Sequence, residues 1–161
     1  MKQVIMTDLS NYHFRKLRSD ENIPYSLLLL ADETIDAIDK YIHNSDIIIL
    51  EQETEIIAVC ATEMVAKQVM EIKNIAVKEQ FQNKGIGFSF LKYIINMAKE
   101  QKCSEVIICT PDVAHKQLYL YQKAGFSIYK IVPDYYPLHY PNLIIENGEI
   151  LKNMVVLKKS L

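Results

Sequence analysis

Several features are missing from this sequence, and each absence excludes a class of protein. No apolar run approaches the 18 residues of a membrane-spanning helix, and residues 1–8 lack the long apolar segment of a signal peptide. The three cysteines, Cys60, Cys103 and Cys109, are odd in number and form no Cys-x-x-Cys pair. The net charge is only −2, which argues against a binder of nucleic acid or membrane surfaces. We therefore expect a reduced, cytoplasmic protein with no metal site, no nucleic-acid partner and no membrane partner.

The sequence also lacks internal repeats, low-complexity segments and any recognisable linker. What it has is 161 residues, half of them hydrophobic, with charges of both signs mixed along the chain. A chain of this length buries roughly 70% of its unfolded surface, which is enough for a real core. We expect one globular domain over residues 1–161.

The pattern of apolar residues predicts alternating strands and helices. Strands are expected at 14–17, 47–50, 56–66, 69–77, 105–110, 126–131 and 153–158, with an Asn-Gly hairpin turn at 147–148. Helices are expected over 27–31, from a cap at Asp32 or Thr34 to about residues 44–45, and over 88–101. Another is expected to begin near Thr110 or Asp112, with Pro111 in its first turn, and to end at Gly125. The strand, helix and strand over 71–110 form a βαβ unit and imply a parallel pair. The fold class is α/β, more strictly α+β: one mixed, mostly antiparallel sheet of six to seven strands with helices on both faces.

The stretch Phe81–Gly87 joins a strand to a helix and carries two glycines where the helix begins. Such a turn presents free N–H groups to a phosphate. A dinucleotide fingerprint fails here because Phe90 stands where a third glycine is needed, and a P-loop fails because Lys84 precedes its glycine. The scheme Gln-x-x-Gly-x-Gly fits Gln82, Gly85 and Gly87.

Two motifs together resemble the GNAT superfamily of N-acetyltransferases. Residues 75–77 followed by 81–87 look like the family's acetyl-CoA pyrophosphate motif, and residues 120–126 look like its second motif, a tyrosine followed by Gly-Phe at a helix end. The order and spacing of the motifs also fit the family. The resemblance covers roughly residues 46–131 and implies a GNAT-like sheet, with acetyl-CoA as the co-substrate.

The resemblance also implies which residues contact acetyl-CoA. The amides of residues 83–88 would hold the pyrophosphate, and the end of the strand over 69–77, which carries a bulge in the family, would pair with the pantetheine arm. The implied cofactor contacts are Ile75, Ala76, Val77, Gln82, Asn83, Lys84, Gly85, Ile86, Gly87 and Phe88.

The same resemblance implies two catalytic residues. Tyr121 would be the general acid that protonates the leaving thiolate. Tyr121 also lies on the same face of its helix as Leu118, a position that suits a core tyrosine. Glu71 would be the base that deprotonates the amine, with Glu63 or an ordered water as alternatives, and a solvent-facing strand glutamate is the structural alternative. The family often has an asparagine seven residues before the tyrosine, where this chain has Ala114, so that cofactor contact must come from elsewhere.

The function implied is transfer of an acetyl group from acetyl-CoA to a primary amine by direct attack in a ternary complex. The alternative is a non-catalytic GNAT-fold module that binds an acyl-CoA as a sensor. The sequence does not identify the acceptor, which could be a small polyamine or amino-sugar, a peptide N-terminus or a lysine. The mildly acidic net charge slightly favours cationic acceptors. The hairpin and last strand would either complete the sheet of a homodimer or close the monomer.

Overall fold

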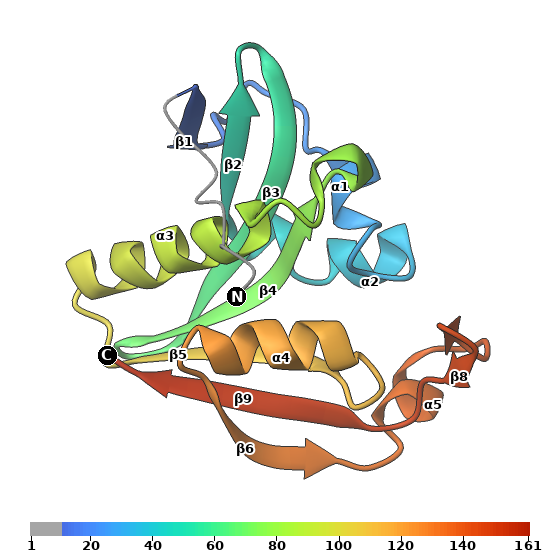
Figure 1. The fold of residues 1–161 in the computed structure, drawn as a ribbon. Coiled ribbons are helices and arrows are strands. Elements are labelled where there is room, and N and C mark those ends of the chain that lie inside the picture. The colour runs from blue at the N-terminus through green and yellow to red at the C-terminus, as the bar shows by residue number, and fades with distance from the viewer. Residues whose placement is uncertain (1–10) are drawn as a thin grey trace, which may run out of the picture. The chain divides into compact units, whose positions relative to one another are not determined.

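The computed structural model describes residues 11–161 (Figure 1). Residues 1–8, on which the expectation of no signal peptide rests, lie outside the described residues. Among residues 11–161, no helix combines the length and the apolar character that a membrane crossing requires. Over the same residues, no group of three or more His, Cys, Asp or Glu side chains is arranged to hold a metal ion.

Hydrogen bonding joins seven strands of the described chain in the order β1-β2-β3-β4-β5-β9-β6. Their bounds are Tyr12–Lys16 (β1), Asp46–Gln52 (β2), Glu55–Ala66 (β3), Val69–Val77 (β4), Glu105–Pro111 (β5), Met154–Ser160 (β9) and Ser127–Val132 (β6). β4 and β5 pair in parallel, as the βαβ pattern predicts. The pairs β1 with β2, β2 with β3, β5 with β9 and β6 with β9 are antiparallel. The predicted mixed, mostly antiparallel sheet is therefore confirmed.

The helices of the described residues vary widely in length. They are α1 (Tyr25–Leu28), α2 (Ile35–Asp39), α3 (Ile86–Glu100), α4 (His115–Lys123) and α5 (Tyr135–His139), with short 3-10 helices η1 (Ile42–Asn44) and η2 (Glu79–Phe81). The helical turn α5 was not predicted, because its Tyr- and Pro-rich segment reads as a loop.

The start of α4 corrects one prediction. Thr110 and Pro111 do not open this helix, because they are the last residues of β5 and pair with Val155 and Met154 of β9. The N-cap position belongs to Ala114, which makes no side-chain capping hydrogen bond. Strand pairing with β9, a strand more than forty residues later in the sequence, overrides the local capping signal.

The N-terminal helices are shorter than the sequence suggests. Of the four consecutive leucines, Leu27 and Leu28 are buried, whereas Leu29 and Leu30 are 38% and 44% exposed. Of the two expected caps, Asp32 and Thr34, it is Thr34 that caps α2, since its side chain accepts a hydrogen bond from a first-turn N–H. The helix predicted to end near residues 44–45 is therefore two short pieces, α2 and η1.

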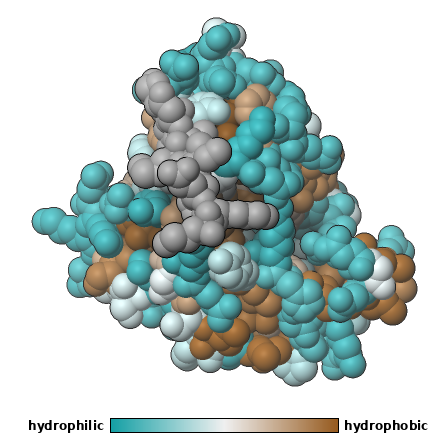
Figure 2. All heavy atoms as spheres, in the orientation of Figure 1, coloured by the Kyte–Doolittle hydropathy of each residue, from teal (hydrophilic) through white to brown (hydrophobic). Residues whose placement is uncertain are grey.

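The last strand of the chain, β9, belongs to the main sheet, and the Asn-Gly hairpin is separate from it. β9 pairs with β5 on one side and with β6 on the other, so the last strand lies inside the sheet. The Asn147-Gly148 turn, with φ of 51° and 78°, joins the separate two-stranded hairpin of β7 (Ile145–Glu146) and β8 (Glu149–Ile150). The edge strand next to β9 is β6, whose side chains Ile128 and Ile131 are exposed. Figure 2 shows hydrophobic side chains among hydrophilic ones where β6 lies in Figure 1.

By internal contacts the chain forms two compact units. The first comprises the residues up to Glu63 together with Lys73–Ile94, and the second comprises Met64–Ile72 with Ile95–Leu161. One cluster of the first unit packs the short helices and η1 against strands β2, β3 and β4; its buried members are Leu27, Leu28, Ile38, Ile42, Ile47, Ile49, Val59, Ala61 and Ala76.

A buried asparagine ties β4 to the N-terminal helices of the first unit. Asn74 is 4% exposed, and its Nδ2 donates to Leu28 O at 2.9 Å and to the Tyr41 hydroxyl at 3.0 Å. Burial raises the pKa of Tyr41, so its hydroxyl stays protonated and donates to Asp32 Oδ2 at 3.3 Å. Asn74 Oδ1 is buried without a hydrogen-bond partner. Because a buried polar group is costly unless it is paired, the two donated bonds hold the segment over 28–41 in one arrangement on β4.

An ion-pair cluster fixes β1 of the same unit. The Arg15 guanidinium donates two hydrogen bonds of 2.7 Å to the carboxylate of Glu21, and bonds of 2.7 and 3.0 Å to that of Glu51. These hydrogen bonds from Arg15, and one from the Arg18 amide, lower the pKa of Glu21 to about 2. Hydrogen bonds from Arg15 likewise lower the pKa of Glu51. Arg15 thus joins β1, the following loop and β2.

We expect Asn74→Ala to lower the free energy of unfolding by about 1–3 kcal/mol, because the hydrogen bonds to Leu28 O and the Tyr41 hydroxyl are lost in a buried place. Urea denaturation measures the change. Asn44→Ala is the control, since Asn44 is exposed, and its effect should stay within about 0.5 kcal/mol. Equal effects of the two substitutions would show that the Asn74 hydrogen bonds contribute nothing to stability.

The lowered pKa values of Glu21 and Glu51 make stability depend on acid pH. A carboxylate with a lowered folded-state pKa stabilises the fold above its ordinary pKa of 4.5, and this stability is lost as the pH falls toward 2. We expect Arg15→Gln to be less stable than the parent at pH 7 and to lose less stability between pH 4.5 and 2. Lys16→Gln, which breaks only the exposed pair with Asp46, should follow the parent curve in a pH series of thermal melts.

Candidate functional site

The glycine turn of the first unit is closed by its own side chains. Gln82 Nε2 donates to Val77 O at 2.8 Å, so the predicted motif glutamine holds the end of β4 to the start of the turn. Lys84 Nζ lies 5.5 Å from the centroid of the Phe81 ring. Asn83 and Gly85 have φ of 59° and 80°, the left-handed region in which glycine is unstrained. The turn is therefore a defined loop with its backbone at the surface.

Helix α3 begins directly after this turn. The Ser89 N–H donates to Gly85 O at 3.1 Å, which places Gly85 at the N-cap, and Ile86 and Gly87 in the first turn. A glycine at this position has no side chain that could cap the amides of the first turn. Those amides and the positive end of the helix dipole form the kind of site that binds phosphate. Ile86 is 1% exposed, so of the predicted contacts it can offer its amide and not its side chain.

The parallel ladder between β4 and β5 is short. In the described chain its register covers Val69–Ile72 against Glu105–Ile108, although β4 continues to Val77 and β5 to Pro111. Backbone groups beyond the end of a ladder need another partner, and an extended ligand can supply one. The predicted contacts Ile75, Ala76 and Val77 lie on this continuation of β4. Ala76 is buried in the core cluster, whereas Ile75 and Val77 are half-buried on the opposite face.

The two candidate bases lie on neighbouring strands and differ in their surroundings. Glu71 is half-buried on β4, on the face opposite to the buried Ile72. Glu63, on β3, is 3.8 Å from Lys73 Nζ, and the side chains of this ion pair are 29% and 24% exposed. Glu63 is therefore engaged by a cation.

The second motif has a local structural cause. At the end of α4 the Phe126 N–H donates to Tyr121 O and the Gly125 N–H donates to Gln122 O, both at 3.0 Å. This is the Schellman pattern, which needs a left-handed residue, and Gly125 has φ of 97°. The rings of Tyr121 and Phe126, 6.3 Å apart, make the contact that accompanies this cap. The spacing from tyrosine to Gly-Phe is thus the sequence signature of a helix end that holds Tyr121 in place.

Tyr121 is 6% exposed, so the structure places it in the second unit as a buried tyrosine. Burial and cap geometry fit both a core residue and a positioned acid. Glu71 belongs to the same unit, whereas Ile75–Val77 and Gln82–Phe88 belong to the first. Ala114, where the family often has an asparagine, is buried at the N-cap of α4 and carries no polar group.

Two polar side chains with structural roles, Asn74 and Asn153, were not predicted from the sequence. Asn74 stands in a strand whose other residues are mostly apolar or charged, and asparagine is depleted in strands, so its type was a signal. Asn153 joins three segments of the second unit. Its Nδ2 donates to Asp112 Oδ2 at 3.0 Å and its Oδ1 accepts from the Asp134 N–H at 3.1 Å. Nothing in the local sequence marks Asn153.

Comparison with known proteins identifies a family and close relatives. The model of the Acetyltransferase (GNAT) family matches residues 11–126. The uncharacterized N-acetyltransferase YvbK of Bacillus subtilis (strain 168) is 38% identical over 131 residues, which are 81% of this chain and 84% of that protein.

Solved structures agree with this result. A GNAT family acetyltransferase from Elizabethkingia anophelis, solved with acetyl-CoA bound, is 38% identical, with a TM-score of 0.91 over 94% of this chain and 99% of that one. An acetyltransferase of Bacillus subtilis, solved in complex with CoA, is 34% identical, with a TM-score of 0.87 over 93% of this chain and 99% of that one. With the glycine turn at the start of α3 and the capped tyrosine helix α4, these matches show that the chain belongs to the Acetyltransferase (GNAT) family.

Proposed function

We propose that this protein transfers the acetyl group of acetyl-CoA to a primary amine by direct attack in a ternary complex. The observation that carries the proposal is the start of α3 at Gly85, where first-turn amides lie behind an exposed glycine turn. Relatives more than 30% identical over nearly their whole length hold acetyl-CoA or CoA. We also propose that residues 1–161 act as a single N-acetyltransferase domain.

The residues of the first unit bind the co-substrate in this proposal. The amides from Asn83 to Phe88 hold the pyrophosphate, and Lys84 adds a positive charge beside it. The backbone of Ile75–Val77 pairs with the amides of the pantetheine arm as an added strand would, because the β4–β5 ladder has already ended at Ile72. Acetyl-CoA supplies the activated thioester.

The chemical step needs one base and one acid. The amine gives up a proton to Glu71 or to a water, and its lone pair attacks the thioester carbonyl carbon. The carbon–sulfur bond breaks, the sulfur keeps the electron pair, and Tyr121 donates a proton to the thiolate. The acylated nitrogen gives up its remaining extra proton, which restores the Tyr121 hydroxyl. The products are the N-acetylated amine and CoA, and no acyl-enzyme forms.

Acetyl-CoA binding is tested by thermal melts. At a hundred times its dissociation constant the ligand should stabilise the protein by about 2.7 kcal/mol, a rise of several degrees in Tm. We expect Gly87→Asp to abolish this rise, because a carboxylate in the first turn of α3 repels the pyrophosphate while it suits the helix dipole. Gln122→Glu adds the same charge at an exposed position of α4 and should keep the rise. A parent protein whose Tm does not respond to acetyl-CoA would contradict the proposal.

The role of Tyr121 is tested by Tyr121→Phe, which keeps the ring and removes the hydroxyl. We expect kcat to fall by about 10²- to 10⁴-fold, while the acetyl-CoA effect on Tm is kept. Tyr119→Phe is the matched control on the same helix, because Tyr119 is 69% exposed, and its kcat should not change. Equal turnover of the two variants, measured as CoA release, would make Tyr121 a core residue only.

If acetyl-CoA binds and a broad panel of amines gives no CoA release, the chain is an acyl-CoA sensor instead.

A further inference from the structure

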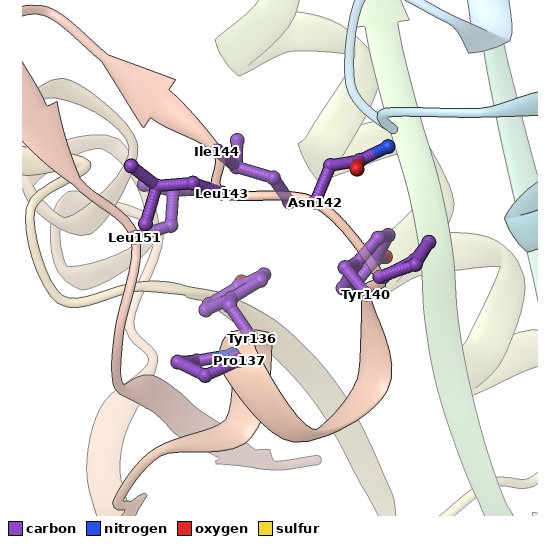
Figure 3. A pocket seen from close by; sticks show the side chains of 8 residues that line it. Tyr136, Pro137, Tyr140, Asn142, Leu143, Ile144 and Leu151 are labelled. Carbon is purple, nitrogen blue, oxygen red and sulfur yellow. The ribbon is translucent and has the colours of Figure 1, made fainter.

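A small pocket lies in the second unit, in the segment over 136–151 that leaves the sheet between β6 and β9. We call it the α5 pocket (Figure 3). Its volume is about 180 Å³, and its lining consists of two tyrosines, two prolines, two leucines, one isoleucine and one asparagine. No charged side chain is among these lining residues. The α5 pocket is therefore suited to an uncharged, largely apolar group.

The walls of the α5 pocket are held by backbone hydrogen bonds. The Tyr136 N–H donates to Lys152 O at 3.1 Å, and the Leu151 N–H donates to Ile144 O at 2.9 Å. Asn153 adds its bridge between Asp112 and Asp134. The pocket is consequently a built feature of the second unit, anchored to the loop that follows β5.

Aromatic rings form one side of the α5 pocket. The Tyr136 and Tyr140 rings stack with centroids 5.8 Å apart and an interplanar angle of 28°. Burial, with smaller contributions from neighbouring groups that include Tyr140 and Cys109, raises the pKa of Tyr136. Its phenol therefore stays neutral, and the pocket gains no charge from it. Stacked rings with a neutral hydroxyl favour a flat aromatic ligand.

The segment that carries the α5 pocket is joined to the end of β5. Asp112, which directly follows β5, donates its N–H to Asn153 O at 3.1 Å and accepts a hydrogen bond of 3.0 Å from Asn153 Nδ2, whereas the ladder with β4 ends earlier on β5, at Ile108. In the proposed function, the pantetheine arm pairs with β4 beyond the end of this ladder. The segment that carries the pocket is therefore held at the end of β5, beyond the last residue pair of the β4–β5 ladder.

Resting on the proposed function, we infer that the α5 pocket binds the ring of the acceptor, and that the acceptor is a primary amine carrying a single aromatic ring on a short chain. An apolar cavity of about 150 Å³ is large enough for benzene, so the α5 pocket has room for one six-membered ring. The amine of such a molecule is acetylated by the step given above, with CoA as the other product.

The same lining disfavours the other acceptor classes. A polyamine or an amino-sugar would bring ammonium or hydroxyl groups into a pocket whose only side-chain polar groups are two phenols and the Asn142 amide. Stripping water from such groups without matching partners is costly. Leu143, which lines the pocket, and Leu138, outside it, are 67% and 77% exposed, and their exposure gives the pocket an apolar approach.

The test compares amines that differ in the ring. CoA release from acetyl-CoA is measured with 2-phenylethylamine, n-butylamine, spermidine and glucosamine. We expect kcat/KM for 2-phenylethylamine to exceed that for each of the others by at least about tenfold, the discrimination that an apolar pocket gives. A preference for spermidine or glucosamine would overturn the inference and leave the proposed function standing.

Two leucines of the same segment supply a matched pair of variants. Leu143→Glu places a carboxylate in the wall of the α5 pocket, and we expect it to reduce the preference for 2-phenylethylamine over n-butylamine to near one. Leu138→Glu makes the same change outside the pocket and should keep the preference. Both side chains are exposed, so neither change should prevent folding, and the Tm of each variant checks this. The same preference in both variants would overturn the inference.

Direct binding separates this inference from the proposed function. Titration calorimetry with 2-phenylethylamine and no cofactor should show saturable binding to the parent chain and at least about tenfold weaker binding to Leu143→Glu. No saturable binding to the parent would overturn the α5 pocket as a ring site. Failure of acetyl-CoA to raise the Tm of the parent would instead overturn the proposed acetyl transfer.

Discussion

The parallel ladder between β4 and β5 is four residue pairs long and ends at Ile72 and Ile108, while both strands run on. Strand pairing is what normally satisfies backbone N–H and C=O groups in a sheet. A ladder that stops early therefore creates a demand for another extended partner along β4. In the proposed function the pantetheine arm is that partner, and the candidate base Glu71 lies inside the ladder, where it pairs with Ile107.

Glycine acts in opposite ways at the ends of the two long helices. At the start of α3, Gly85 has no side chain of its own to cap the first-turn amides, which suits the binding of an anion there. At the end of α4, Gly125 closes the helix on itself through the Schellman hydrogen bonds and holds Tyr121 against Phe126. One glycine supplies no side-chain cap and the other closes its helix, so both motifs of the sequence have a physical cause at a helix terminus.

Features with a local cause were predictable from the sequence, and features that depend on distant pairing were not. The Asn-Gly hairpin, the Thr34 cap and the βαβ unit follow from short-range rules and are confirmed. The start of α4 was predicted wrongly because β9 draws Thr110 and Pro111 into β5. The walls of the α5 pocket could not be placed from the sequence, because hydrogen bonds between distant residues, such as that from Tyr136 to Lys152, hold them together.

The acidic net charge gave a slight lean toward cationic acceptors, and the arrangement of charges weakens that argument. Many carboxylates of the described chain are engaged by cations, as Glu21 and Glu51 are by Arg15, and Glu63 is by Lys73. Paired charges contribute little field to a distant ligand in physiological salt. Selectivity then depends on the surface that the acceptor touches, and the α5 pocket offers rings and methyl groups there. Net charge is a property of the whole chain, whereas acceptor choice is decided by a few side chains that composition does not locate.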